Sequence, residues 1–129
     1  MTVTVVAAII RRDNKILITR RFDHVHLPGY WEFPGGKVET NESLPAALER
    51  EILEELGVQI SVHGELFAVQ HEYPTRPVEL HFFNCSIITG EPHPVEVADL
   101  RWVEPASLVQ FQFPPADEEL IQRLTCPEA

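Results

Sequence analysis

Residues 36–58 read GKVETNESLPAALEREILEELGV, which is a loop followed by a helix and a stop signal. Ser43 is a typical N-cap residue, and Pro45 is tolerated in the first turn, where its missing N–H would have no helical partner. Gly57 suits the left-handed residue that commonly ends a helix. These signals predict a helix over residues 44–56.

The predicted helix has an apolar side and an acidic side. The apolar residues recur every fourth position and suit docking on a sheet; they are Leu48, Ile52 and Leu56. The acidic residues stand at i, i+3 and i+4; they are Glu51, Glu54 and Glu55. Carboxylates so close repel one another unless a hard cation such as Mg²⁺ or Mn²⁺ lies among them. The alternative is a solvated acidic face, which the helix alone does not exclude.

The loop before the helix favours the metal-binding interpretation. The stretch fits the pattern G-x5-E-x7-R-E-U-x-E-E-x-G-U, where U is aliphatic. Its fixed places hold Gly36, Glu42, Arg50, Glu51, Ile52, Glu54, Glu55, Gly57 and Val58. The seven non-aliphatic places would coincide by chance at roughly one starting position in 10⁸. The stretch is therefore identified as a Nudix box.

Composition limits the class of protein. With 129 residues and 44% hydrophobic content, we expect a single domain over residues 1–129. A net charge of −10 argues against a nucleic-acid partner. Carboxylates that hold metal ions can nevertheless form part of a polyphosphate-binding site, because the bound cations make the local charge positive. Without a signal-peptide pattern or a run of 18 apolar residues, we expect no membrane partner and a cytoplasmic location. Cys85 and Cys126 lack zinc-type spacing and are expected to be free thiols.

The other segments predict strands around this helix. Apolar β-branched runs predict strands over residues 2–10, 16–20, 59–70, 78–88 and 95–103. The first two are expected to form a hairpin, and the third and fourth an antiparallel pair. Residues 21–30 have no period and are expected to form a loop. A short helix over residues 105–109 and a closing helix that ends near residue 124 complete an α/β fold.

Resemblance to the Nudix family covers nearly the entire chain and implies an α-β-α sandwich with a mixed sheet. The segments WEFPGGKVE (31–39) and FPPAD (113–117) resemble the MutT type. Such enzymes hydrolyse a nucleoside triphosphate to a monophosphate and pyrophosphate, using Mg²⁺ or Mn²⁺. Some members remove 8-oxo-dGTP from the nucleotide pool, and close relatives act on CTP, dCTP and oxidised pyrimidine nucleotides. The implied partner is a small-molecule nucleoside triphosphate.

The resemblance also implies roles for individual residues. The positions that hold metal are matched by the Gly35 carbonyl, Glu51, Glu54 and Glu55. Glu96, six residues before Trp102, matches a further carboxylate that binds metal or takes a proton from the attacking water; the alternative is an exposed strand residue. Arg50 resembles the arginine that orients the carboxylates. Arg21 and Lys37 match positions that face phosphate oxygens, with solvated cations as the alternative.

Recognition of the base is implied for Asp117 and His26. An ionised Asp117 only accepts hydrogen bonds, which suits the amino group of cytosine. The N7–H of 8-oxoguanine is also a donor, and a buried Asp can be protonated and donate, so both bases remain open. A plain helix N-cap is the alternative for Asp117. His26 lies in the loop where related enzymes close on the nucleotide; the alternative is a loop residue without a role.

We therefore expect a Mg²⁺-dependent, MutT-like pyrophosphohydrolase that uses direct attack by water, with 8-oxo-dGTP as the leading substrate. The same reaction on CTP, dCTP or modified pyrimidine nucleotides is the main alternative. Hydrolysis of dinucleoside polyphosphates or RNA 5′ ends ranks below it. A Nudix-fold binding module without catalysis belongs to another class, and the complete set of box glutamates argues against it. Nothing in the sequence indicates an oligomeric state.

Overall fold

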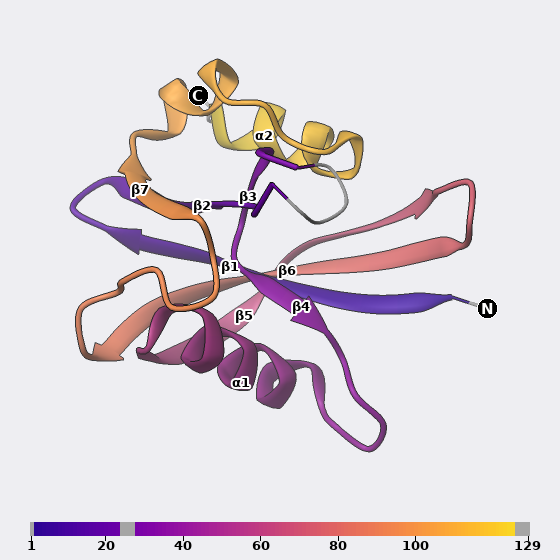
Figure 1. The fold of residues 1–129 in the computed structure, drawn as a ribbon, viewed down its shortest axis with the longest axis horizontal. Coiled ribbons are helices and arrows are strands. Elements are labelled where there is room, and N and C mark those ends of the chain that lie inside the picture. Colours follow the sequence, from indigo (N-terminus) through magenta and orange to yellow (C-terminus); the bar gives the residue numbers. More distant parts are fainter. Residues whose placement is uncertain (1, 24–27, 126–129) are drawn as a thin grey trace.

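The computed structural model describes residues 2–23 and 28–125. In chain order the elements are β1 (Val3–Arg12), β2 (Lys15–Arg20), β3 (Trp31–Glu32), β4 (Gly35–Lys37), α1 (Leu44–Leu56), β5 (Gln59–Glu72), β6 (Pro77–Thr89), β7 (Asp99–Val103), the 3-10 helices η1 (Pro105–Gln110) and η2 (Pro115–Asp117), and α2 (Glu118–Thr125). Figure 1 shows the strands between α1 on one side and η1 with α2 on the other. The α-β-α sandwich is confirmed.

Strand β1 organises the sheet. It pairs in parallel with β6, from Val3 opposite Val78 to Ile10 opposite Cys85. On its other edge, β1 pairs antiparallel first with β4 and then with β2, as the expected hairpin requires. Strand β5 pairs antiparallel with β6, and β2 also carries β3 and β7 as antiparallel neighbours. Parallel and antiparallel pairings coexist, so the predicted mixed sheet is confirmed.

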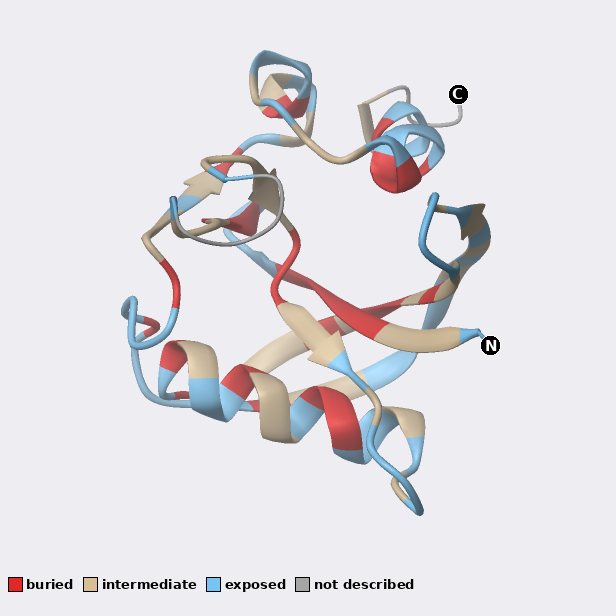
Figure 2. Ribbon diagram, turned by 45° about the vertical axis from the view of Figure 1, so that its right-hand side comes forward, coloured by how far each residue is buried: buried red, intermediate tan, exposed pale blue. Residues whose placement is uncertain are grey.

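Helix α1 begins and ends where the sequence predicts, because both ends are determined locally. The Ser43 hydroxyl accepts a hydrogen bond from the backbone N–H of Ala46 at 3.2 Å. Gly57 adopts a left-handed conformation with φ 72°, and its N–H donates to the carbonyl of Leu53. In Figure 2 the buried positions of α1 face the strands. They are Ala47, Leu48, Ile52 and Leu56.

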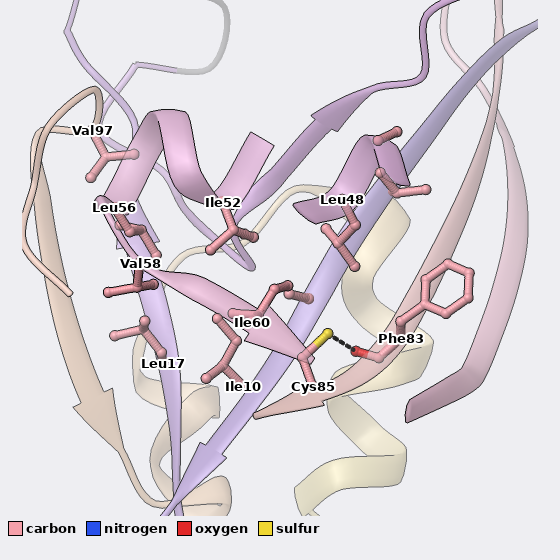
Figure 3. Packing of buried hydrophobic residues seen from close by; sticks show 13 residues of the cluster. Ile10, Leu17, Leu48, Ile52, Leu56, Val58, Ile60, Phe83, Cys85 and Val97 are labelled. Atoms are coloured by element: carbon pink, nitrogen blue, oxygen red, sulfur yellow. Dashed lines mark hydrogen bonds between the residues drawn. The ribbon is translucent and has the colours of Figure 1, made fainter. Parts of the chain in front are cut away.

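Two hydrophobic cores lie on opposite faces of the strands, since successive strand residues point to opposite sides. In the core under α1, Ile10, Leu17 and Phe83 pack against the buried side of the helix, as Figure 3 shows. The strand residue next to each of them points to the opposite face. The other core takes Ile9, Ile16 and Phe82, and packs them against η1 and α2 through Leu108 and Leu120. The helices therefore cover both faces of the sheet.

The strand predicted over residues 95–103 is only partly correct, because β7 begins at Asp99. The backbone N–H groups of Val95 and Glu96 both donate to the carbonyl of Glu55, at 3.0 and 3.1 Å. The N–H of Ala98 donates to the carbonyl of Arg20 at 2.9 Å. The segment before β7 thus caps the end of α1 and does not continue the ladder.

Two findings bear on the expectations from composition. Cys85 is a free, buried thiol, and burial raises its pKa to about 12, so it is a poor nucleophile at neutral pH. Cys126 lies outside the described residues. Within residues 2–23 and 28–125, none of the helices combines the length and the apolar character needed to cross a bilayer.

His81 makes the stability of the sheet depend on pH. Its Nδ1 lies 3.0 Å from Glu65 Oε2 on β5, and its Nε2 lies 3.2 Å from Glu79 Oε1 on β6. Burial lowers the pKa of His81, but the hydrogen bonds and charges of Glu65 and Glu79 outweigh burial and raise it. Because the folded-state pKa exceeds the unfolded value, this stabilisation is present below the unfolded pKa of about 6.5 and is lost as pH rises through the folded pKa.

The substitution His81→Gln tests this dependence. We expect it to lower the free energy of unfolding at about pH 5.5 and to have a clearly smaller effect at about pH 8.5. Urea unfolding of both proteins at the two pH values measures the difference. An equal loss at both values would contradict the role of the protonated imidazole.

Candidate active site

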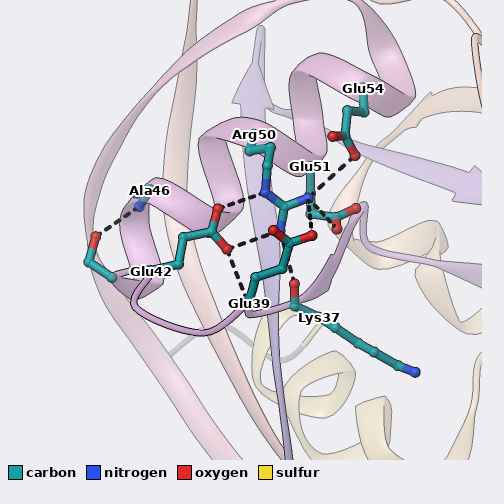
Figure 4. A network of polar contacts seen from close by, with 8 residues as sticks. Lys37, Glu39, Glu42, Ala46, Arg50, Glu51 and Glu54 are labelled. Atoms are coloured by element: carbon teal, nitrogen blue, oxygen red, sulfur yellow. Dashed lines mark hydrogen bonds and ion pairs between the residues drawn. The ribbon is translucent and has the colours of Figure 1, made fainter.

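Arg50 lies at the centre of the box carboxylates (Figure 4). Its Nε and Nη2 donate to the two oxygens of Glu42 at 2.6 and 3.0 Å. Its Nη1 donates to Glu51 Oε2 at 3.0 Å and to Glu54 Oε1 at 3.4 Å. Its Nη2 also donates to the Lys37 carbonyl at 3.1 Å. One guanidinium therefore ties the loop to α1 and holds two of the three carboxylates of α1 that are predicted to bind metal.

Glu55, the third of these carboxylates, lies deeper in the protein. Its Oε1 is buried without a hydrogen-bond partner in the described residues. Burial is the largest cause that raises the pKa of Glu55 to about 9; the charges of Glu32 and Glu51 add to it, and hydrogen bonding from the Gly35 backbone opposes it. Burial also raises the pKa of Glu51, against the effect of Arg50. A bound cation would satisfy this orphaned oxygen and relieve the repulsion.

The donor set suits a hard divalent cation. Glu51 and Glu54 each accept a hydrogen bond from Arg50 with one oxygen, which leaves the other oxygen for a metal ion. Glu55 offers the unpartnered Oε1. Among residues 2–23 and 28–125, no three His, Cys, Asp or Glu side chains are arranged to hold a metal ion. Arg50 holds one carboxylate oxygen of Glu51 and one of Glu54. The ligand atoms suit a metal ion, while the side chains of Glu51 and Glu54 are directed at Arg50.

The glycine pair of β4 packs closely against its neighbours. A Cβ on Gly35 would overlap the carbonyl oxygen of Val6 on β1, and a Cβ on Gly36 would overlap the carboxylate of Glu51. Gly35 needs glycine because the overlap there is with backbone, whereas at Gly36 the overlap is with the movable end of a side chain. The same packing places the Gly35 backbone beside Glu55, where its hydrogen bond partly offsets the rise in the pKa of that carboxyl group.

The substitution Gly36→Ala is expected to lower activity more than stability. The overlap is with the flexible end of Glu51, so the carboxylate can move away at little cost but loses its hydrogen bond to Arg50. We expect kcat/KM on the best substrate to fall about tenfold with a small change in Tm, because catalytic groups depend on exact placement. Gly64→Ala is the matched control, since its added Cβ would meet no atom within 4 Å. Equal effects at both glycines would contradict this interpretation.

A cavity of about 590 Å³ adjoins the carboxylates and is lined by Glu55. Phe33 and Phe82 form part of its wall, with ring centroids 5.9 Å apart and planes at 88°. Both are buried, so these two aromatic residues belong to the core as well as to the cavity. Phe83 instead lies in the core under α1. The tip of the β5–β6 hairpin, including Tyr73, also lines the cavity.

Asp117 also lines this cavity, from the last position of η2. Its side chain is buried, and it makes no hydrogen bond or ion pair to any other described residue. The N-cap alternative therefore has no hydrogen bond to support it. Burial, and then the charge of Glu32, raise the pKa of Asp117 to about 7.

The predicted phosphate-facing cations, Arg21 and Lys37, both line the cavity. Arg21 Nη1 donates to Glu32 Oε1 at 2.9 Å, so this guanidinium is already engaged. Lys37 is exposed, and its ammonium forms no ion pair within the part of the chain that the structure describes. Arg21 is therefore paired with a carboxylate, whereas Lys37 is exposed and is not.

Glu96 is not among the residues that line the cavity. Glu96 is exposed and contacts α1 through its backbone N–H, which donates to the Glu55 carbonyl. His26 lies outside the described residues. The sequence analysis did not single out Glu32, which lines the cavity and pairs with Arg21. Its only sequence signal is its position in WEFPGG; the pairing of β2 with β3 brings it beside Arg21.

Comparisons with known proteins agree on one family. A family model described as the NUDIX domain matches residues 5–123. The CTP pyrophosphohydrolase of Escherichia coli strain K12 is 39% identical over 120 residues, covering 93% of this chain and 89% of that protein. An 8-oxo-dGTP diphosphatase of Haemophilus influenzae is 39% identical over 124 residues, covering 95% and 90%. The crystal structure of a MutT NUDIX hydrolase from Burkholderia pseudomallei matches with a TM-score of 0.85 at 28% identity, covering 95% of this chain and 97% of that one.

Proposed function

This chain belongs to the NUDIX domain family, and from that premise we propose that it hydrolyses a nucleoside triphosphate to the monophosphate and pyrophosphate. We assign 8-oxo-dGTP as the leading substrate, and CTP, dCTP or modified pyrimidine nucleotides as the alternative. One observation carries the proposal: a single cavity is lined by the box carboxylate of Glu55 and by the buried carboxyl of Asp117. Phosphate chemistry and base recognition can therefore take place in one site.

Nudix hydrolases need a divalent metal ion. We assign Mg²⁺ to this protein, with Mn²⁺ as a substitute, because every proposed ligand is a hard oxygen. The proposed ligands are the Gly35 carbonyl and the carboxylates of Glu51, Glu54, Glu55 and Glu96. Bound there, the ion would lower the pKa of a water molecule and neutralise charge on the phosphate oxygens.

The residues of the chain supply positioning and proton transfer. Arg50 orients Glu51 and Glu54 through the hydrogen bonds described above. A nearby glutamate, with Glu96 as the candidate outside the box, accepts the proton of the attacking water. Lys37 is available to a phosphate oxygen as a charged donor. The reaction needs no side-chain nucleophile, and Cys85 is too deeply buried to act as one.

We propose direct attack by water at the β-phosphorus. Hydrolysis in ¹⁸O-labelled water tests the position of attack, because the attacked phosphorus keeps the label. Label in pyrophosphate alone is the expected result. Label in the nucleoside monophosphate would place the attack at the α-phosphorus.

The substrate is tested by measuring kcat/KM with Mg²⁺ on 8-oxo-dGTP, dGTP, CTP, dCTP and 5-methyl-dCTP. Pyrophosphate and phosphate are quantified separately, so that pyrophosphohydrolysis is distinguished from stepwise removal of phosphate. A preference for 8-oxo-dGTP over dGTP by several orders of magnitude supports nucleotide-pool sanitation. Higher values on the cytosine nucleotides support the alternative, and no hydrolysis of any of the five contradicts both.

A further inference from the structure

The segment between β6 and β7 docks on the C-terminal end of α1 (Figure 1). Residues 90–98 form this docking segment. The backbone N–H groups of Val95 and Glu96 donate to the carbonyl of Glu55, at 3.0 and 3.1 Å, and the Val97 side chain is buried in the core under α1. The backbone of Glu96 is therefore tied to the backbone of Glu55, so the position of one proposed metal ligand depends on that of another.

One arginine of β1 contacts the chain on both sides of Glu96. Arg12 Nη1 and Nη2 donate to the two carboxylate oxygens of Glu91, at 3.1 and 2.9 Å. The guanidinium carbon of Arg12 also lies 4.3 Å from the ring centroid of Trp102 on β7, which is a cation–π contact. Glu91 precedes Glu96 by five residues, and Trp102 follows it by six. Arg12 therefore holds both sides of the chain that carries Glu96.

The His93 ring lies against Gly57, the residue that ends α1. A Cβ on Gly57 would lie 2.6 Å from His93 Cε1, so the ring packs on the bare Cα of the glycine. The His93 N–H donates to the carbonyl of Leu56 at 3.1 Å, and its Nδ1 lies 3.3 Å from the Glu91 carbonyl oxygen. The first half of the docking segment is thereby held between the end of α1 and the residue that Arg12 binds.

The ion pair between Arg12 and Glu91 is suited to fixing geometry more than to adding stability. The two side chains are 39% and 72% exposed, and pairs as exposed as this contribute little to the free energy of unfolding. Two parallel hydrogen bonds nevertheless define an orientation as well as a distance. Catalytic groups are sensitive to displacements of about 1 Å. Loss of the pair should therefore affect the position of Glu96 before it affects the fold.

We propose that Arg12 is a positioning residue that acts through Glu91 to hold Glu96 in place relative to Glu55. Arg12 does not line the cavity of about 590 Å³, so it acts only through the docking segment. This role rests on the proposed function, in which Glu55 and Glu96 belong to one metal site.

The first test measures docking without turnover. Glu91→Ala removes the carboxylate at an exposed position, so the variant should fold. In the metal-free protein, the backbone amides of Val95 and Glu96 should exchange with deuterium about tenfold faster, because their hydrogen bonds to Glu55 open more often. The amide of Ile52, inside α1, should keep its rate. Amide exchange followed by NMR measures all three sites.

Two further variants separate the forked contact from charge. Arg12→Lys keeps a cation near Trp102 but cannot bond both oxygens of Glu91, so it should also speed the exchange of these two amides. Arg11→Lys is the matched control. Arg11 is exposed, points to the other face of β1 and forms no ion pair within the described residues, so this variant should leave the exchange rates unchanged.

The second test is a double-mutant cycle on kcat. Glu91→Ala should lower kcat about fivefold and leave KM near the wild-type value, because the cavity itself is unchanged. In a Glu96→Gln background the same change should lower kcat by less than about twofold, because the carboxylate that it positions is already gone. A general loss of stability would instead lower kcat equally in both backgrounds.

Three results would overturn the proposal: unchanged amide exchange at Val95 and Glu96 in Glu91→Ala, equal losses of kcat in the two backgrounds, or full activity of Glu96→Gln, which would leave no group to position. Failure of the proposed function is distinct from all three, because the wild type would then hydrolyse none of the nucleotides.

Discussion

Glu55→Gln is expected to lower kcat/KM by on the order of 10³-fold, because it removes a carboxylate from the proposed metal site. The protein should nevertheless fold with an unchanged or higher Tm. Glu55 is half-buried near Glu32 and Glu51, its pKa is raised to about 9, and its buried Oε1 has no partner in the described residues. Glutamine has nearly the same shape and, like the protonated Glu55, carries no charge, so it fits the same position. Steady-state kinetics and thermal unfolding without added metal measure the two effects.

Glu49→Gln is the matched control, since Glu49 is an exposed glutamate on the same helix and does not line the cavity. It should leave kcat/KM and Tm nearly unchanged.

Proton release gives a readout of Glu55 that is independent of turnover. At about pH 7 Glu55 retains its proton, so binding of Mn²⁺ to the wild type should release about one proton, and binding to Glu55→Gln should release fewer. Full activity of Glu55→Gln would show that Glu55 is not part of the metal site. Equal proton release by the two proteins would contradict the raised pKa of Glu55.

Local sequence signals were sufficient for the central helix. Ser43 and Gly57 satisfy backbone groups at the two ends of α1, so the boundaries follow from residues within a few positions of each end. The spacing of Glu51, Glu54 and Glu55 likewise follows from helical geometry alone. The resemblance to the Nudix family is confirmed by the family model, which matches residues 5–123. It could be read from the sequence because the box motif lies in α1 and the loop before it.

Short strands were not predictable, because they depend on partners far away in the sequence. Strands β3 and β4 contain two and three residues, too few to show an alternating pattern. Each exists only because an earlier strand offers a free edge, β2 for β3 and β1 for β4. For the same reason the predicted start of β7 was wrong. Backbone N–H groups of residues 95–98 donate to carbonyls of α1 and β2, so these residues do not pair as part of the strand.

The base side of the cavity illustrates the same limit. Asp117 was predicted by resemblance, but its burial and lack of partners depend on how η2 packs beside the hairpin tip. Glu32 was missed because its pairing with Arg21 requires the contact between β2 and β3. Sequence spacing therefore predicts groups that one helix brings together, whereas the charge balance of a cavity lined by six elements requires the structure.

Arg50→Lys is expected to lower kcat/KM about 10²-fold, because small displacements of catalytic groups are costly. Arginine bonds both oxygens of Glu42 while a third nitrogen reaches Glu51 and Glu54. Lysine keeps the charge but has a single ammonium, which cannot make these contacts at once. The box loop should loosen from α1 and Tm should fall. Kinetics on the best substrate and thermal unfolding test both expectations.

Arg123→Lys is the matched control, because Arg123 is exposed, pairs with Glu119 at 3.4 Å on α2 and lies over the Phe67 ring, and lysine can make both contacts. Exposed pairs of this kind contribute little, so kcat/KM and Tm should stay near the wild-type values. If Arg50→Lys retained full activity, positive charge alone would be sufficient at this position and the forked hydrogen bonds would be dispensable. If it lost activity with an unchanged Tm, Arg50 would act on the carboxylates without holding the loop, because the tie to Glu42 and the Lys37 carbonyl is what links the loop to α1.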